Sequence, residues 1–278
     1  MCASDPVSGP RGMRRMLPAS AGDRAFLGVS VLLFAVGATA SIAGGVSMSA
    51  MGEMPMPGGW ILSMTWTRGC GQTWPDVAAS FLGMWMAMML AMMLPSLVPA
   101  LWRYRAALGR AGATRPGPLA TLAGAGYFLV WNAFGAAVFP LGVVLAAIEL
   151  RQPALARAVP LVSGAVVVLA GAFQFSPWKT RRLDACGGLS SGDGSLPVRA
   201  AAAWRAGLRL GWHCSGNCVG FTAILLVLGA MDLGVMALVT VAITAERLVP
   251  ARHGATRTIG LVMLVAGGAL IVRGIGPG

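Results

Sequence analysis

Charged residues divide this sequence into long uncharged apolar runs, and these runs limit its fold more than any other feature. A helix that crosses a lipid bilayer needs about 20 predominantly apolar residues. Five runs reach this length, and they cover residues 25–52, 77–102, 116–148, 158–178 and 210–231. Two shorter runs, 233–245 and 258–272, are marginal for a span, and they reach about 17 residues when the flanking Glu and Arg side chains extend toward the membrane surfaces.

We therefore predict an all-α fold, a polytopic transmembrane helix bundle with seven spans. The spans are expected at about residues 25–47, 78–101, 119–148, 158–177, 210–231, 233–249 and 257–273. A re-entrant hairpin is the alternative for the last two. We expect residues 1–23 to form a disordered N-terminus and residues 24–278 a single transmembrane domain. The first run exceeds the 7–15 apolar residues of a signal peptide, so we expect an uncleaved anchor.

Composition excludes several classes of protein. Apolar residues make up 56% of the chain and charged residues only 11%, whereas about 25% of a soluble chain is charged. A cytosolic enzyme, a secreted disulfide scaffold and a disordered chain are therefore excluded. The net charge of +12 does not indicate a nucleic-acid partner, because the basic residues lie between the apolar runs. The lipid bilayer is the expected partner instead.

The distribution of basic residues predicts the orientation in the membrane. If the N-terminus is inside, 17 of the 21 Lys and Arg residues fall on the inner side, as the positive-inside rule requires. The exceptions are Arg68, Arg151, Arg157 and Arg273. Lys179 is the only lysine, and this bias, with abundant Ala and Gly, is typical of a GC-rich bacterial genome. The expected location is the bacterial inner (cytoplasmic) membrane.

An outer segment between the first two spans carries a cluster of methionines. Met48, Met51, Met54 and Met56 lie within nine residues that also contain Gly and Pro. Thioethers are soft, neutral ligands that suit Cu(I) in oxidising surroundings. We interpret these four residues as candidate metal ligands. The alternative is an apolar loop at the membrane surface, anchored by nearby tryptophans.

The second span has its own methionine stripe. Met84, Met88 and Met92 recur every four residues, so they share one face of a helix. Methionine often fills gaps in helix packing, and packing is the first interpretation. Additional thioether ligands for a metal are the second.

The strongest candidate metal ligands open the fifth span. Cys214 and Cys218 are four residues apart, so their thiols share one helix face, and His213 lies beside them. Two thiolates with an imidazole suit a soft metal such as Cu(I) or Zn(II). The alternatives are two small packing thiols and a thiol–disulfide site. A tight turn at Asp232 would bring Glu246 back toward this level.

Three blocks of the sequence carry a family resemblance. They are Trp85-x-x-Met88-x-x-Ala91-Met92-Met93-Leu94-Pro95-x-x-x-Pro99, Gln174-x-x-Pro177-x-Lys179-x-x-x-Leu183-x-x-Cys186, and Gly207-Leu208-Arg209 through Cys214-x-Gly216-x-Cys218 to Glu246-Arg247. Together they resemble an uncharacterised bacterial family of predicted metal-binding integral membrane proteins, some of which are labelled copper chaperones. The family often has a cysteine at the position of Asn217.

The residues and the resemblance lead to one functional hypothesis. The chain is expected to bind a soft transition metal, Cu(I) with Zn(II) as the alternative, for uptake or delivery to a copper-handling protein partner. Weak thioethers outside and strong thiolates near the inner face would draw Cu(I) inward. We expect no enzymatic activity. Two other classes remain open: an assembly or scaffold subunit that binds no metal, and a transporter of a non-metal solute.

Overall fold

The computed structural model describes residues 21–50, 54–56, 60–62, 64–69, 71–186, 198–229, 232–249 and 252–275. These residues form a helical bundle, which confirms the predicted all-α class. The helices are α1 (Ala21–Ala50), α2 (Trp74–Arg110), α3 (Pro116–Arg151), α4 (Pro153–Phe173), α5 (Pro177–Cys186), α6 (Ala200–Leu228), α7 (Leu233–Leu248) and α8 (Arg252–Ile275). A small antiparallel hairpin of β1 (Met54–Met56) and β2 (Trp60–Leu62), with the 3-10 turn η1 (Met64–Trp66), follows α1.

Local sequence explains where several helices begin. Proline occupies the first turn of α3, α4 and α5, where its fixed φ fits a helix and its missing N–H costs nothing. At the start of α2, Thr73 and Asp76 cap each other's backbone N–H groups. Each expected span coincides with a helix, and α1 begins at Ala21, inside the segment expected to be disordered.

Six of the described helices, α1, α2, α3, α4, α6 and α8, are long and apolar enough to cross a membrane. This finding supports a multi-pass membrane protein. Helix α7 has only 16 residues, which span about 24 Å at 1.5 Å per residue. The hydrocarbon core of a bilayer is about 30 Å thick. The seventh span therefore stays a prediction.

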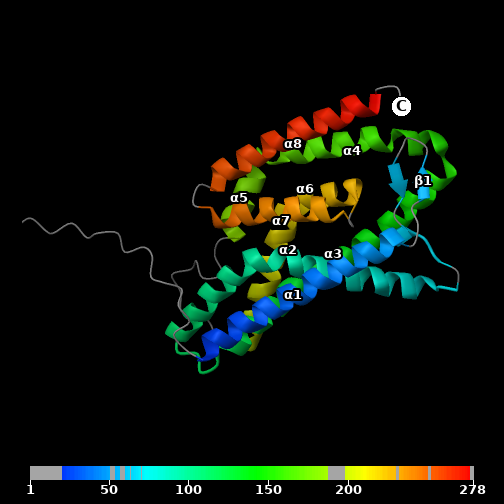
Figure 1. Cartoon of the computed structure of the whole chain (residues 1–278). Helices are drawn as coiled ribbons and strands as arrows, with labels where there is room; N and C mark the ends of the chain where they lie inside the picture. The colour runs from blue at the N-terminus through cyan, green and yellow to red at the C-terminus, as the bar shows by residue number, and fades with distance from the viewer. Residues whose placement is uncertain are drawn as a thin grey trace, which may run out of the picture.

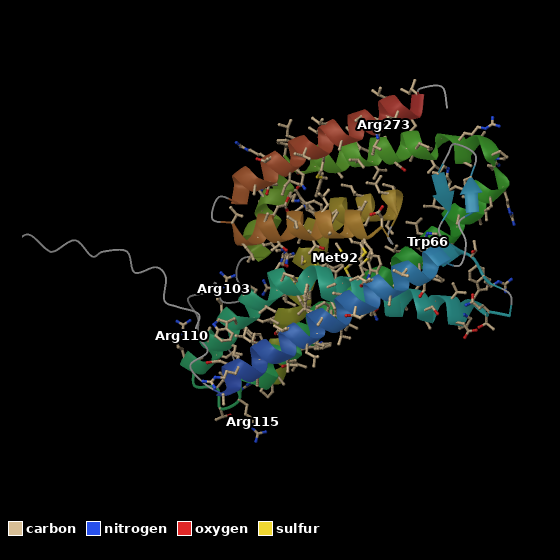
Figure 2. All side chains as sticks on the ribbon, in the orientation of Figure 1. Trp66, Met92, Arg103, Arg110, Arg115 and Arg273 are labelled. Atoms are coloured by element: carbon tan, nitrogen blue, oxygen red, sulfur yellow. The ribbon has the colours of Figure 1, made fainter. Side chains whose placement is uncertain are left out.

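Successive long helices alternate in direction, as a membrane bundle with short connections requires. The α2–α3 and α7–α8 connections lie at one end of the bundle, and the α3–α4 connection lies at the other (Figure 1). Figure 2 shows Arg103, Arg110 and Arg115 at the first end and Arg273 toward the second. The basic end is therefore the one that the sequence places inside.

Glycines bring two pairs of helices into close contact. At Gly171 of α4, a Cβ atom would lie 3.0 Å from the Gly260 carbonyl oxygen of α8, and at Gly126 of α3 it would lie 2.9 Å from the Trp204 carbonyl oxygen of α6. A glycine at each of these two positions lets the helix backbones approach closely, as is typical of membrane helix packing. The α3–α6 contact matters for function, because it positions the candidate site.

The hairpin after α1 closes one end of the bundle. The Trp60 indole N–H donates to the Ala156 carbonyl oxygen at 2.8 Å. Met56 is buried against Ala146 of α3 and Ala156 of α4. This small apolar cluster is distinct from the main core, to which α2, α3, α4, α6, α7 and α8 contribute.

Candidate metal centre

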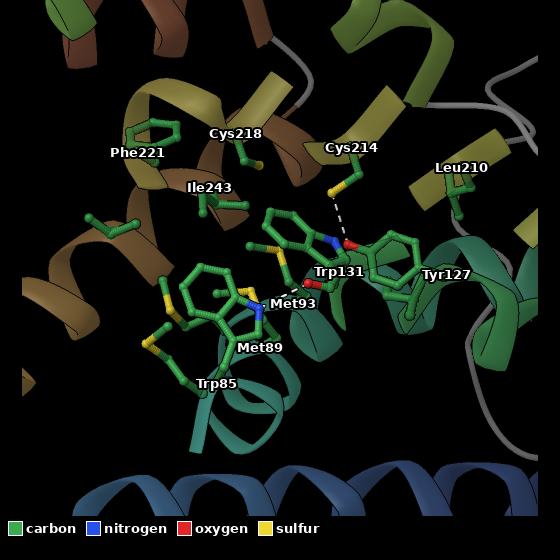
Figure 3. Close-up of a cluster of buried hydrophobic side chains, with 14 of the residues drawn as sticks. Trp85, Met89, Met93, Tyr127, Trp131, Leu210, Cys214, Cys218, Phe221 and Ile243 are labelled. Carbon is green, nitrogen blue, oxygen red and sulfur yellow. Dashed lines mark hydrogen bonds between the residues drawn. The ribbon is translucent and has the colours of Figure 1, made fainter. Parts of the chain in front are cut away.

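Two thiols lie at the centre of the main core. Cys214 and Cys218 of α6 are fully buried, and neither forms a disulfide. They are one helical turn apart, so both sulfurs face the same side of α6. Figure 3 shows them projecting toward Trp131 of α3 and Met93 of α2. The structure thus brings the two predicted thiol ligands together.

Helix α3 reaches the thiols because two glycines of α6 leave room for its backbone. A Cβ atom at Gly207 would overlap the Ala123 carbonyl group, and one at Gly211 would lie 3.0 Å from the Tyr127 carbonyl oxygen. This close approach places the Tyr127 hydroxyl 2.9 Å from the Cys214 sulfur (Figure 3). Tyr127 is itself fully buried, so its hydroxyl contacts the Cys214 sulfur instead of solvent.

A cation from α7 touches both thiols. The Arg247 Nη2 atom donates to the Cys214 sulfur and lies 3.8 Å from the Cys218 sulfur. Its Nη1 atom donates to the Ser96 hydroxyl of α2 at 3.1 Å. A guanidinium beside a sulfur favours the thiolate form, which is the form that binds metals. Arg247 therefore links three helices and prepares the thiols for a cation.

A second pair of charges is buried next to this group. The Lys179 Nζ atom lies 3.0 Å from both carboxylate oxygens of Glu246, and each side chain is 1% exposed. The ammonium also lies 4.5 Å from the centroid of the Phe221 ring. Burial lowers the pKa of Lys179, and the Glu246 carboxylate acts in the opposite direction. The pair is neutral as a whole, which makes its burial tolerable.

Comparison with known proteins gives this site a context. A family model named PpoB2 and described as copper chaperone matches residues 82–270. The chain belongs to this copper chaperone family. No curated protein and no solved structure gives a significant match. The matched region contains the thiol pair and every residue that contacts it.

The methionines of α2 divide between two surroundings. Met88, Met89, Met92 and Met93 are buried in the same core as the thiols. Met84 is half-buried and faces α1, because a Cβ atom at Gly44 would lie 3.0 Å from its sulfur. Met88 and Met92 therefore lie in the same core as the thiols, while Met84 packs elsewhere.

Of the four outer methionines, the structure describes the side chain of Met56 alone. Met51 lies outside the described residues, and the structure does not describe the side chains of Met48 and Met54. Met56 packs in the separate cluster at the hairpin. The residues that pack against Met56 in this cluster are apolar. A metal site at the four methionines stays a prediction.

Two polar residues of α6 flank the thiols. His213 is half-buried and occupies the neighbouring helix face. Asn217 is 1% exposed, and neither its Oδ1 nor its Nδ2 atom has a hydrogen-bond partner among the described residues. Within that part of the chain, no three His, Cys, Asp or Glu side chains gather to hold a metal. A structural zinc site almost always has four ligands, so this donor set fits Cu(I) better than Zn(II).

Sequence reasoning missed three residues of the site: Tyr127, Ser96 and Arg247. Arg247 follows Glu246 at the end of an apolar run, and a charged pair at this place can indicate a site. From the sequence alone, both side chains are instead expected to extend toward the membrane surface. Tyr127 is one of only two tyrosines in the chain. Neither sign reveals a contact with Cys214, because the contacts join separate helices.

Proposed function

We propose that the chain binds Cu(I) through Cys214 and Cys218 within a membrane helix bundle and passes it to a copper-handling protein. The observation that carries this proposal is the pair of free, fully buried thiols in contact with a guanidinium and a phenol. Membership of a copper chaperone family supports the choice of metal. Copper is the cargo in this proposal, and the protein supplies ligands, charge and a dry site.

The donor set favours a soft cation. Thiolates and thioethers select Cu(I) among the common metals, and Met88 and Met92 lie in the same buried core as the thiols. His213 is a further candidate ligand from the next face of α6. Zn(II) is the competing metal, and it would lack the tetrahedral ligand set that it usually has.

Our proposal includes a direction of copper movement. In our proposal the basic end of the bundle faces the cytoplasm of a bacterium, and the chain lies in the inner membrane with its N-terminus inside. Met48, Met51, Met54 and Met56 then capture Cu(I) outside, and the thiol pair near the inner face binds it more strongly. We propose uptake or delivery and no catalytic reaction.

The decisive experiment removes both thiols. Cys214→Ser with Cys218→Ser should eliminate most of the copper that co-purifies with the protein in detergent, measured by mass spectrometry of the metal content. Cys186→Ser is the control, because Cys186 ends α5 and does not belong to the helix that carries the thiol pair. It should keep the copper content of the wild type.

Two outcomes separate the competing classes. Equal copper in the double variant and the wild type would mean that the thiols only pack between helices. Preserved biological function in a copper-free double variant would identify the chain as a scaffold subunit or a transporter of another solute.

A further inference from the structure

We propose that Trp131 of α3 stabilises the loaded site by donating a hydrogen bond from its indole N–H to a metal-bound cysteine sulfur. This inference rests on the proposed function, because it assumes that Cys214 and Cys218 hold the metal. It adds a positioning residue that acts through the thiols and does not itself bind the cargo. The reasoning starts from a donor that the fold buries beside the thiols.

The indole N–H of Trp131 is that donor. The Trp131 side chain is 0% exposed, and its Nε1 atom has no hydrogen-bond partner among the described residues. The neighbouring indole of Trp85 differs, because its N–H donates to the Trp131 carbonyl oxygen at 2.9 Å (Figure 3). A buried N–H without an acceptor is costly, and such a group in a native structure calls for an explanation.

The pairing of α3 with α6 places this indole at the level of the thiols. Gly207 of α6 faces Ala123 of α3, and Gly211 faces Tyr127. Both helices therefore advance by four residues between these two contacts. One further step of four residues places Trp131 beside the turn of α6 that carries the thiols. Figure 3 agrees, since both cysteine side chains point toward the Trp131 indole.

Metal binding supplies the acceptor that the indole lacks. A cysteine binds a metal as a thiolate, and a thiolate accepts a stronger hydrogen bond than a neutral thiol, which is a weak acceptor. Cys214 and Cys218 are both 0% exposed, so water does not compete for their sulfurs and a hydrogen bond there is strong. The bond forms only in the loaded state, so it increases the affinity for the metal.

NMR of the indole N–H groups tests the inference directly, because Cu(I) is diamagnetic. The detergent-purified protein, labelled with ¹⁵N at its nine tryptophans, is compared before and after anaerobic addition of Cu(I). We expect the N–H proton signal of Trp131, identified by its absence in Trp131→Phe, to move downfield as the new hydrogen bond forms. A Trp131 signal that stays in place on loading would overturn the inference.

Binding measurements on two matched variants separate the hydrogen bond from packing. Trp131→Phe keeps an aromatic ring and removes the N–H, so Cu(I) binding should weaken by about tenfold, measured by competition with a chromogenic chelator. Trp85→Phe makes the same change in the same core, at an indole whose N–H already has an acceptor, and should keep the affinity of the wild type. Equal losses of affinity in the two variants would assign the effect of Trp131 to packing alone.

The two proposals fail in different ways. If Cys214→Ser with Cys218→Ser binds Cu(I) as the wild type does, the proposed site is wrong, and the inference is wrong with it. If binding needs the thiols but the Trp131 signal does not respond, the site is right and the inference is wrong. Should Trp131→Phe fail to fold, the wild-type spectra still decide, because the absence of any downfield movement among the indole signals on loading refutes the hydrogen bond.

Discussion

Cys214 receives polar contacts from two other helices, and the two contacts act differently. Arg247 supplies a full positive charge, and Tyr127 supplies a neutral hydroxyl. When Cys214 binds a metal as a thiolate, the Tyr127 hydroxyl must be the donor, and a hydrogen bond to a charged acceptor is stronger than one to a neutral thiol. Tyr127 therefore stabilises the loaded state more than the empty one.

The Tyr127→Phe variant tests this role. The ring stays in the core and the hydroxyl is lost, so we expect normal folding and about tenfold weaker Cu(I) binding. Competition with a chromogenic Cu(I) chelator measures the affinity. Tyr104→Phe is the matched control, because Tyr104 is also buried and is not among the described residues that hydrogen-bond to the thiols. Equal affinities for the two variants would contradict the role of Tyr127.

Residue spacing predicted the thiol pair but not its neighbours. Cys214 and Cys218 share a face because they belong to one helix, and a period of 3.6 residues can be read directly from the sequence. Arg247 and Tyr127 come from helices 33 and 87 residues away in the chain. Their contacts depend on how helices pair, and local periodicity contains no information about pairing.

The sequence predicted where the helices lie along the chain, but not which helices pack against each other. Apolar runs located each long helix, yet α2 continues to Arg110, past the end of its expected span. The arginines of its last turns end the uncharged run, although Tyr104 and Leu108 are still buried there. The pairing of α3 with α6 depends on glycines such as Gly207 and Gly211. The same glycines could be read in the sequence, but the helix that each one faces could not.

The Gly207→Ala variant tests whether this pairing builds the site. The added methyl group would overlap the Ala123 carbonyl group, so α3 and α6 must separate. We expect the free energy of unfolding to fall by about 1–3 kcal/mol and Cu(I) binding to weaken, because Tyr127 moves away from Cys214. Thermal unfolding in detergent and chelator competition measure the two effects.

Gly83→Ala provides the comparison for Gly207→Ala. Nothing lies within 4 Å of a Cβ atom at Gly83 in α2, so this change should be neutral or stabilise the protein by about 0.5–1 kcal/mol. If Gly207→Ala matched Gly83→Ala in both measurements, close approach of α3 would not be needed for the site.

At the scale of the whole molecule, we predict that α7 crosses the membrane. Its 16 residues are short for a span, and α7 is absent from the six helices that satisfy the length and hydropathy criteria. Two observations favour crossing. Helix α7 runs back along α6 far enough for Arg247 to reach Cys214. A non-spanning α7 would also leave Arg247, Arg252 and Arg257 on the outer side, against the positive-inside rule.

Reporter fusions decide between six and seven spans. With the N-terminus inside, seven spans place Gly278 outside, and six place it inside. We therefore expect alkaline phosphatase fused after Gly278 to be active, phosphatase fused at Ser190 to be inactive, and phosphatase fused at Thr65 to be active. The last two fusions are controls, because both sites precede α7 in the chain and their phosphatase activity is the same for six and for seven spans.

An inactive C-terminal fusion, with both controls as expected, would show that α7 does not cross. Arg247 would then reach the thiols from the outer side, and the proposed inward direction of copper movement would have to be abandoned.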